Sequence, residues 1–170
     1  GMFHLMDDAF DKAREDLAVA VEEQPDNASL HEAIGLACLM GERLAEARDA
    51  FGKAIELEPD AIGPLLQRAR VWAVEGDTEQ ALADIDRAVD LEPENRAALL
   101  LRARINQQAG DSHAALADIE TVLAEEPDQQ SALELRGLLA AERQDYPAAI
   151  DDFRRLAARN PDDPAVIGQL

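Results

Sequence analysis

The chain has 170 residues, of which 47% are hydrophobic and only 4% aromatic, and its 36 acidic and 16 basic residues give a formal net charge of −20. Such a negative chain is a poor partner for nucleic acid or anionic lipid, because phosphate groups are bound by clustered Lys and Arg. No stretch has the roughly 18 consecutive apolar residues of a membrane span. No secretory signal pattern opens the sequence, so the expected location is the cytoplasm.

A repeat of 34 residues organises the sequence. Its clearest column is a proline followed by an acid, at Pro25, Pro59, Pro93, Pro127 and Pro161. Two further columns lie four residues apart in each period: Ala13, Ala47, Ala81, Ala115 and Ala149, then Leu17, Phe51, Ile85, Ile119 and Phe153. Residues four apart share one face of a helix, so these columns predict a buried helical stripe.

The predicted elements follow in chain order. A single helix within residues 7–27 corresponds to the second helix of a unit. Four two-helix units follow at 28–61, 62–95, 96–129 and 130–163, and residues 164–170 begin a further helix. The first helix of each unit carries a small residue where two backbones approach closely, at Gly35, Ala69, Ala103 and Gly137.

Turn signals separate the two helices of a unit. Gly76-Asp77 and Gly110-Asp111 supply a glycine for the turn and an aspartate that caps the next helix by accepting hydrogen bonds from its free N–H groups. In the fourth unit Asp145 is the expected cap, and Pro147 falls in the first helical turn, where proline is tolerated.

This period resembles the tetratricopeptide repeat (TPR), whose pattern is W-x2-L-G-x2-Y, A-x3-F and P. The best match is Leu65-x2-Arg68-Ala69-x2-Trp72 with Ala81-x3-Ile85 and Pro93. The resemblance covers nearly the whole chain. It implies an all-α fold, a right-handed α-solenoid of stacked antiparallel helix hairpins in one array over residues 2–170, and a protein-binding role without catalysis.

The chain departs from the TPR pattern in the first helix of each unit. The expected aromatic residue is present only as Trp72, and Cys38, Asn106 and Ala140 stand in the equivalent places, so looser packing is expected there. A normally apolar column reads Ile34, Arg68, Arg102 and Arg136, and a column in the second helix reads Ala50, Asp84, Asp118 and Asp152.

These last two columns change together: the repeat with Ile in the first column has Ala in the second, and the repeats with Arg in the first have Asp in the second. They predict ion pairs within each unit: Arg68–Asp84, Arg102–Asp118 and Arg136–Asp152. Pairing to the preceding unit fits less well, because Arg68 would then face Ala50. The alternative is that these arginines reach a ligand.

Catalytic and metal-binding patterns are absent from the sequence. The histidines, His4, His31 and His113, have no metal-ligand spacing, and His31 aligns with leucines of other units. Cys38 is the single cysteine, which excludes an internal disulfide, and it has no partner for nucleophilic catalysis. No catalytic residue, cofactor or metal is expected, although an active site built on unrecognised carboxylates stays open.

In TPR proteins the first helix of each hairpin lines a concave groove that binds peptides. The residues carried over to this groove are Leu36, Met40, Leu66, Gln67, Arg70, Val74, Leu100, Leu101, Arg104, Gln108, Leu135 and Leu138. We expect Arg70 and Arg104 to bind a carboxylate of the partner while leucines receive its apolar side chains. Alternatively, both arginines pair with acids of the chain or are solvated. The family's clamp for chaperone C-termini needs Lys and Asn where this chain has Glu32 and Leu36, so that role is not expected.

The ends of the sequence leave further alternatives. Stacked repeats need terminal units with a polar outer face. Here the sequence begins with half a unit and ends early in a further helix, so either it is part of a longer protein or its open ends form a homo-oligomer. The expected contact face is Ile150, Phe153, Leu156 and Ile167. A peptide- or protein-binding adaptor, a self-assembly module and a non-catalytic arm of a larger enzyme or secretion component are the three functions considered.

Overall fold

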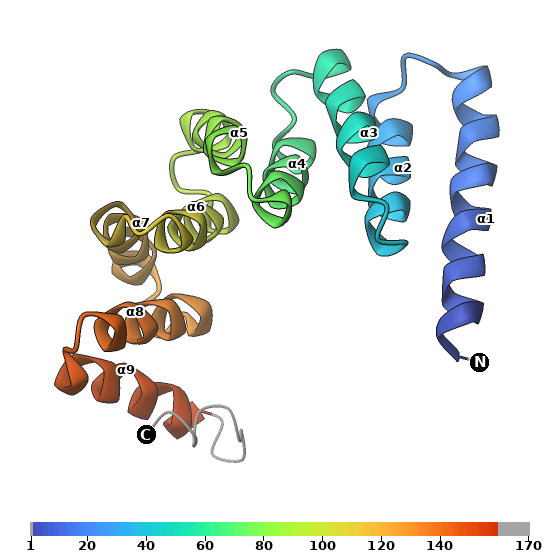
Figure 1. Ribbon diagram of the computed structural model, residues 1–170. Coiled ribbons are helices and arrows are strands. Elements are labelled where there is room, and N and C mark those ends of the chain that lie inside the picture. Colours follow the sequence, from blue (N-terminus) through green and yellow to red (C-terminus); the bar gives the residue numbers. More distant parts are fainter. Residues whose placement is uncertain (1, 160–170) are drawn as a thin grey trace. The chain divides into compact units, whose positions relative to one another are not determined.

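The computed structural model describes the backbone of residues 2–159 and the side chains of residues 10, 12 and 14–158. All regular structure in this part of the chain is α-helical (Figure 1). The helices are α1 (Met2–Glu23), α2 (Ala28–Met40), α3 (Leu44–Leu57), α4 (Ile62–Glu75), α5 (Thr78–Leu91), α6 (Arg96–Gln108), α7 (Ser112–Glu125), α8 (Gln130–Glu142) and α9 (Tyr146–Arg159). None of them, over the residues described, is long and apolar enough for a membrane span.

The helices gather into two compact units, residues 1–91 with α1–α5 and residues 92–170 with α6–α9. In the first unit, α2 with α3 and α4 with α5 form hairpins, α1 packs on α2, and α3 packs on α4. In the second unit the hairpins are α6 with α7 and α8 with α9, and α8 contacts both α6 and α7. The fold is therefore an all-α helical-repeat solenoid whose helices cluster into two units.

The hairpins begin at the residues where the repeats were expected. Helices α2, α4, α6 and α8 start at residues 28, 62, 96 and 130. Helix α1 takes the place of the expected half-unit, but it has 22 residues and begins at Met2, ahead of the expected start at residue 7. The segment 164–170, where a further helix was expected, lies outside the described residues.

The core of each hairpin comes from the repeat columns. The alanine column of the second helices and the residue four positions later are buried in every hairpin: Ala47 and Phe51, Ala81 and Ile85, Ala115 and Ile119, Ala149 and Phe153. Burying a large apolar side chain contributes about 1.5–3 kcal/mol relative to leaving it exposed. The stripe predicted from the spacing is thus the surface on which each second helix packs.

The size of the residue on the first helix matches the ring or branched chain that it meets. A Cβ atom added to Gly35 would lie 2.5 Å from the Phe51 ring, and one added to Gly137 would lie 2.8 Å from the Phe153 ring. The other two hairpins have alanine in the first helix and isoleucine in the second, and all four of those side chains are fully buried. In the sequence, glycine in the first helix is accompanied by phenylalanine in the second, and alanine by isoleucine.

The turn between the helices of a hairpin has the same backbone shape in all four repeats. One residue is left-handed in each, with φ of 57° at Glu42, 84° at Gly76, 83° at Gly110 and 62° at Gln144. The aspartate that follows caps the second helix in three repeats. Asp77 accepts from the Gln80 N–H at 3.1 Å, Asp111 from Ala114 at 3.0 Å, and Asp145 from Ala148 at 3.3 Å.

Candidate functional site

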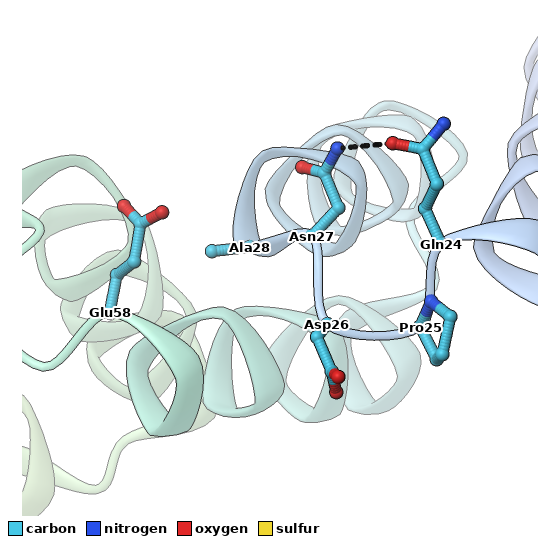
Figure 2. A pocket seen from close by; sticks show the side chains of 6 residues that line it. All are labelled: Gln24, Pro25, Asp26, Asn27, Ala28 and Glu58. Carbon is cyan, nitrogen blue, oxygen red and sulfur yellow. Dashed lines mark hydrogen bonds between the residues drawn. The ribbon is translucent and has the colours of Figure 1, made fainter.

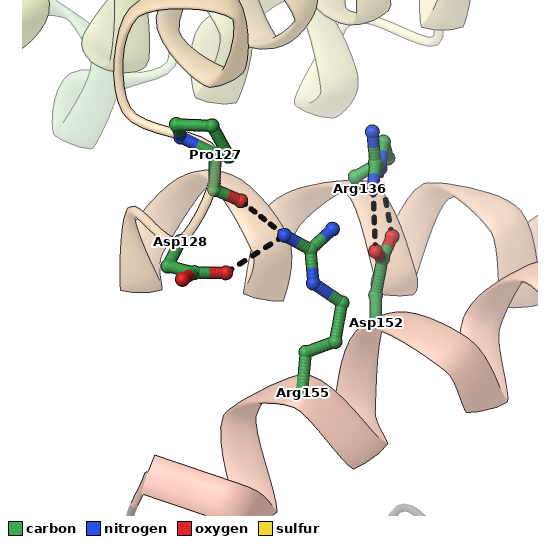
Figure 3. Close-up of polar contacts among 5 residues, drawn as sticks. All are labelled: Pro127, Asp128, Arg136, Asp152 and Arg155. Atoms are coloured by element: carbon green, nitrogen blue, oxygen red, sulfur yellow. Dashed lines mark hydrogen bonds and ion pairs between the residues drawn. The ribbon is translucent and has the colours of Figure 1, made fainter.

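The three arginine–aspartate pairs predicted within the repeats are all present. In each pair the guanidinium Nε and Nη2 donate to the two carboxylate oxygens, at 2.6–2.8 Å. The Arg136–Asp152 pair is drawn in Figure 3. Two parallel hydrogen bonds of this kind fix both the distance and the rotation of the two helices.

These pairs lie at the border between the hairpin core and solvent. The carboxylates of Asp84, Asp118 and Asp152 are 9%, 7% and 3% exposed, while the arginines keep about a quarter to a third of their side chains exposed. Hydrogen bonding to Asp84 raises the pKa of the Arg68 guanidinium despite its partial burial, and Asp152 does the same to Arg136. Both cations are therefore held in the hairpin, and the arrangement favours a structural role over contact with a ligand.

A second arginine ties a hairpin to the loop before it. The Arg155 Nη2 on α9 donates to the Pro127 carbonyl oxygen at 2.6 Å and to Asp128 at 2.7 Å (Figure 3). Two repeats earlier, Arg87 on α5 lies 3.9 Å from Asp60 in the equivalent loop. In these two repeats the acid that follows the repeat proline thus has a partner in the second helix, a link that sequence spacing alone did not reveal.

The first helices of the first unit, α2 and α4, expose most of their predicted groove residues. Leu36, Met40 and Val74 are 37%, 61% and 70% exposed, Arg70 is exposed, and Leu66 and Gln67 are half-buried. Glu32 of α2 reaches toward Gly63 of α4, so the two helices lie together at this level. Arg70 has no ion pair or hydrogen-bonding partner for its side chain among the described residues.

The first helices of the second unit, α6 and α8, present a more polar surface. Arg104 and Gln108 are exposed, while Leu100, Leu101 and Leu138 are half-buried. Leu135 is only 4% exposed, so its side chain is packed inside the unit. The Gln107 amide donates to Glu142 at 2.9 Å and joins the two helices. Arg104, like Arg70, has no side-chain partner within the part of the chain that the structure describes.

One aromatic residue fills the junction between α3 and α4. The Arg48 guanidinium carbon lies 4.7 Å from the centroid of the Trp72 ring. The same guanidinium donates from Nη1 to Glu75 at 2.9 Å. A cation over an indole face is attracted by the ring quadrupole. Ring, cation and acid therefore form one cluster on the surface of the first unit.

Other predicted positions have packing roles. The ring of His31 donates from Nε2 to the Pro25 carbonyl oxygen at 2.9 Å, and Cys38 is buried. Phe153 and Leu156, expected on an open end face, are also buried. Ile167 and the side chain of His4 lie outside the described residues.

An open cavity of about 470 Å³ lies where the α1–α2 turn approaches the end of α3 (Figure 2). Its lining includes the carboxylates of Asp26 and Glu58, and the Asn27 amide donates to Gln24 at 3.1 Å. A search of the described residues finds no group of three or more His, Cys, Asp or Glu arranged to hold a metal ion.

The repeat architecture has a direct counterpart among protein families. The family model for the tetratricopeptide repeat matches residues 8–62, 66–108 and 106–164. The chain belongs to the TPR family. No curated protein matches this TPR sequence at a significant level.

Solved structures of several other proteins share the fold. A TPR protein from Parabacteroides merdae superposes with a TM-score of 0.86 at 24% identity, over 94% of this chain and 64% of that chain. PilW, a type IV pilus biogenesis factor, gives 0.82 at 24% identity, over 93% of this chain and 74% of its own. YrrB, a TPR protein with an unusual peptide-binding site, gives 0.77 at 19% identity, over 95% and 83%. At these identities the likeness establishes the fold.

Proposed function

We propose that this TPR chain is a non-catalytic module that binds a segment of another protein, and that the faces of its first helices are the contact surfaces. The observation that carries the proposal is the face of α2 and α4. Three large apolar side chains are exposed there on a strongly acidic chain, beside an arginine without a partner among the described residues. YrrB supports the proposal as a TPR protein described by its peptide-binding site.

The chemistry of this face indicates the segment that it binds. Complete burial of an exposed apolar side chain contributes about 1.5–3 kcal/mol, so Met40 and Val74 gain a large part of this from a partner and Leu36, which is 37% exposed, gains less. Methionine adapts its shape to irregular surfaces, which suits a site for side chains of varied form. Arg70 adds a planar donor for a carboxylate. The segment proposed for α2 and α4 is therefore apolar, with at least one acidic residue.

The face of α6 and α8 plays the smaller part in this proposal. Leu100, Leu101 and Leu138 offer less exposed area, and Glu142 is already bonded to Gln107. Arg104 is the group on this face that remains for a carboxylate of the partner. The proposed role of Arg104 is thus to bind an acidic residue of a partner segment at the face of α6 and α8.

The test begins with selection of peptides from a displayed random library on the wild-type chain. Selected sequences should combine apolar residues with Asp or Glu. Fluorescence anisotropy of a labelled selected peptide should then show at least tenfold weaker binding to Arg70→Glu and to Met40→Glu, and a smaller loss for Arg104→Glu. Arg154→Glu is the matched control, because Arg154 is an exposed arginine on α9 without a partner among the described residues.

Two outcomes contradict the proposal. One is equal affinity of the selected peptides for wild type and for the Arg70→Glu/Arg104→Glu double variant. The other is a concentration-dependent oligomer in light scattering that the Met40→Glu variant abolishes, because a second copy of the chain then occupies the face.

A further inference from the structure

A cavity in the second unit lies at the place that Trp72 fills in the first. In the first unit, α3 contributes Arg48 and α4 contributes Trp72 and Glu75, and these three side chains form the ring, cation and acid cluster described above. Two repeats further along the chain, the equivalent positions on α7 and α8 carry Leu116 and Ala140, and Arg143 follows the end of α8. The ring, the cation over it and the acid are therefore all replaced there.

The space left by these smaller residues is open. A cavity of about 400 Å³ lies among α7, α8 and α9 and is lined by Leu116, Arg136, Ala140, Arg143, Asp145 and Ala148. Its apolar wall is Leu116 with the two alanines. Ala140, where the missing aromatic residue predicts looser packing, lines this cavity.

The charges around the cavity are incomplete in one respect. Arg136 is held by Asp152, and Asp145 caps α9 just as Asp77 caps α5 in the repeat that contains Trp72. Arg143 is exposed and has no side-chain partner among the residues described. It stands where the first unit has Glu75, so the sign of the charge is reversed. A carboxylate is therefore the group that would pair with Arg143. The repeat with Trp72 shows that there is room for one, because Glu75 lies there beside the capping aspartate Asp77.

We propose that this cavity binds an aromatic side chain of a partner segment, with a neighbouring carboxylate of the same segment paired to Arg143. The ring takes the place beside Ala140 and Leu116 that Trp72 takes in the first unit. Leu116 stands where the first unit has Arg48, so the ring is held here by apolar contact with Leu116 and the two alanines, without the stacked guanidinium that Trp72 has. The site lies outside the first-helix faces and goes beyond the proposed function.

The probe is the dipeptide Ac-Trp-Asp-NH2, titrated into the full ¹⁵N-labelled chain and followed by amide chemical shifts. The amides of Ala140, Arg143 and Ala148 should shift with a single saturating curve. Ac-Trp-Asn-NH2 keeps the ring without the charge and should bind at least fivefold more weakly. Ac-Ala-Asp-NH2 keeps the charge without the ring and should leave these amides unshifted.

Variants of the chain separate this site from the first-helix face. Arg143→Glu should weaken binding of Ac-Trp-Asp-NH2 at least tenfold, and Ala140→Trp, which fills the cavity with the chain's own indole, should abolish it. Arg154→Glu and Arg70→Glu should bind as wild type does. If Ala140→Trp does not fold by circular dichroism, Ala140→Leu serves as the smaller filler.

Three results would overturn the inference. The first is that the amides of the cavity do not shift at saturating Ac-Trp-Asp-NH2. The second is that the Ala140→Trp variant binds the dipeptide as tightly as wild type. The third is a dimer of the free chain that the filled variant loses, since a second copy would then occupy the cavity. Weaker binding of a selected peptide to Arg70→Glu, with Ac-Trp-Asp-NH2 still bound as tightly as by wild type, concerns the proposed function and not this site.

Discussion

The hairpins α2–α3 and α4–α5 of the first unit have the same backbone plan but differ at two coupled pairs of residues and at one turn residue. Ile34 and Ala50 stand in one where Arg68 and Asp84 stand in the other. Glycine meets phenylalanine in the first, and alanine meets isoleucine in the second. The left-handed turn residue is Glu42 in one and Gly76 in the other. The comparison teaches that the hairpin constrains pairs of residues and leaves single positions free to vary with their partners.

The largest effect is expected from breaking the ion pair of α4–α5. Asp84→Ala removes the partner of Arg68 and leaves a partly buried cation, which should lower the free energy of unfolding by about 3 kcal/mol, the lower end for buried pairs because Arg68 is 25% exposed. Urea denaturation followed by circular dichroism measures this, and Asp118→Ala should behave alike in the second unit.

The matching double variant sharpens the comparison. Arg68→Ile/Asp84→Ala gives α4–α5 the apolar pair of α2–α3 and should return the stability to within about 1 kcal/mol of wild type, because an ion pair and a packed apolar pair are often equivalent in energy. A double variant as unstable as Asp84→Ala would show that the two columns are not exchangeable as a pair.

A middle-sized effect is expected from the close approach of glycine and phenylalanine. Gly35→Ala places a methyl group against the Phe51 ring and should cost about 1–2 kcal/mol, since overpacking outweighs the gain in helix propensity. Gly35→Ala/Phe51→Ile copies α4–α5 and should recover part of this loss in thermal unfolding. Equal stability of Gly35→Ala and wild type would mean that the ring moves aside at no cost.

The smallest effect is expected at the left-handed turn. Glu42→Gly relieves a side chain at φ 57° and should raise the stability by up to about 1 kcal/mol, partly offset by the greater freedom of glycine in the unfolded chain. Gly76→Glu should lower it by a similar amount. The change in melting temperature measures both, and the idea is wrong if the two substitutions shift it in the same direction.

Much of the hairpin architecture could be predicted from the sequence, because the features involved are local. A 34-residue period, turn glycines and capping aspartates act over a few residues, and the Arg–Asp columns vary together in the printed sequence. The sequence also shows the coupling of Gly35 with Phe51 and of Gly137 with Phe153, because both columns vary together in the same way.

The remaining features depend on packing that a single sequence does not encode locally. The division after Leu91 falls at a loop with the same proline and acid as the others. Leu135 sits at a position that helical spacing places in a groove, yet neighbouring helices bury it. Cys38 and Ala140 both replace an aromatic residue, but Cys38 is only 1% exposed while Ala140 lines a cavity, because the facing helix decides the outcome.

The Arg–Asp pairs also bear on how such a chain can grow or shrink during evolution. Each buried carboxylate of this set is neutralised inside its own hairpin, by a residue encoded 16 positions earlier. Duplication or deletion of one whole repeat therefore adds or removes both partners together and leaves no buried carboxylate without its arginine. Pairs between neighbouring hairpins would instead be broken wherever such a repeat came to lie beside one with other residues in these columns, as the first repeat has with Ile34 and Ala50.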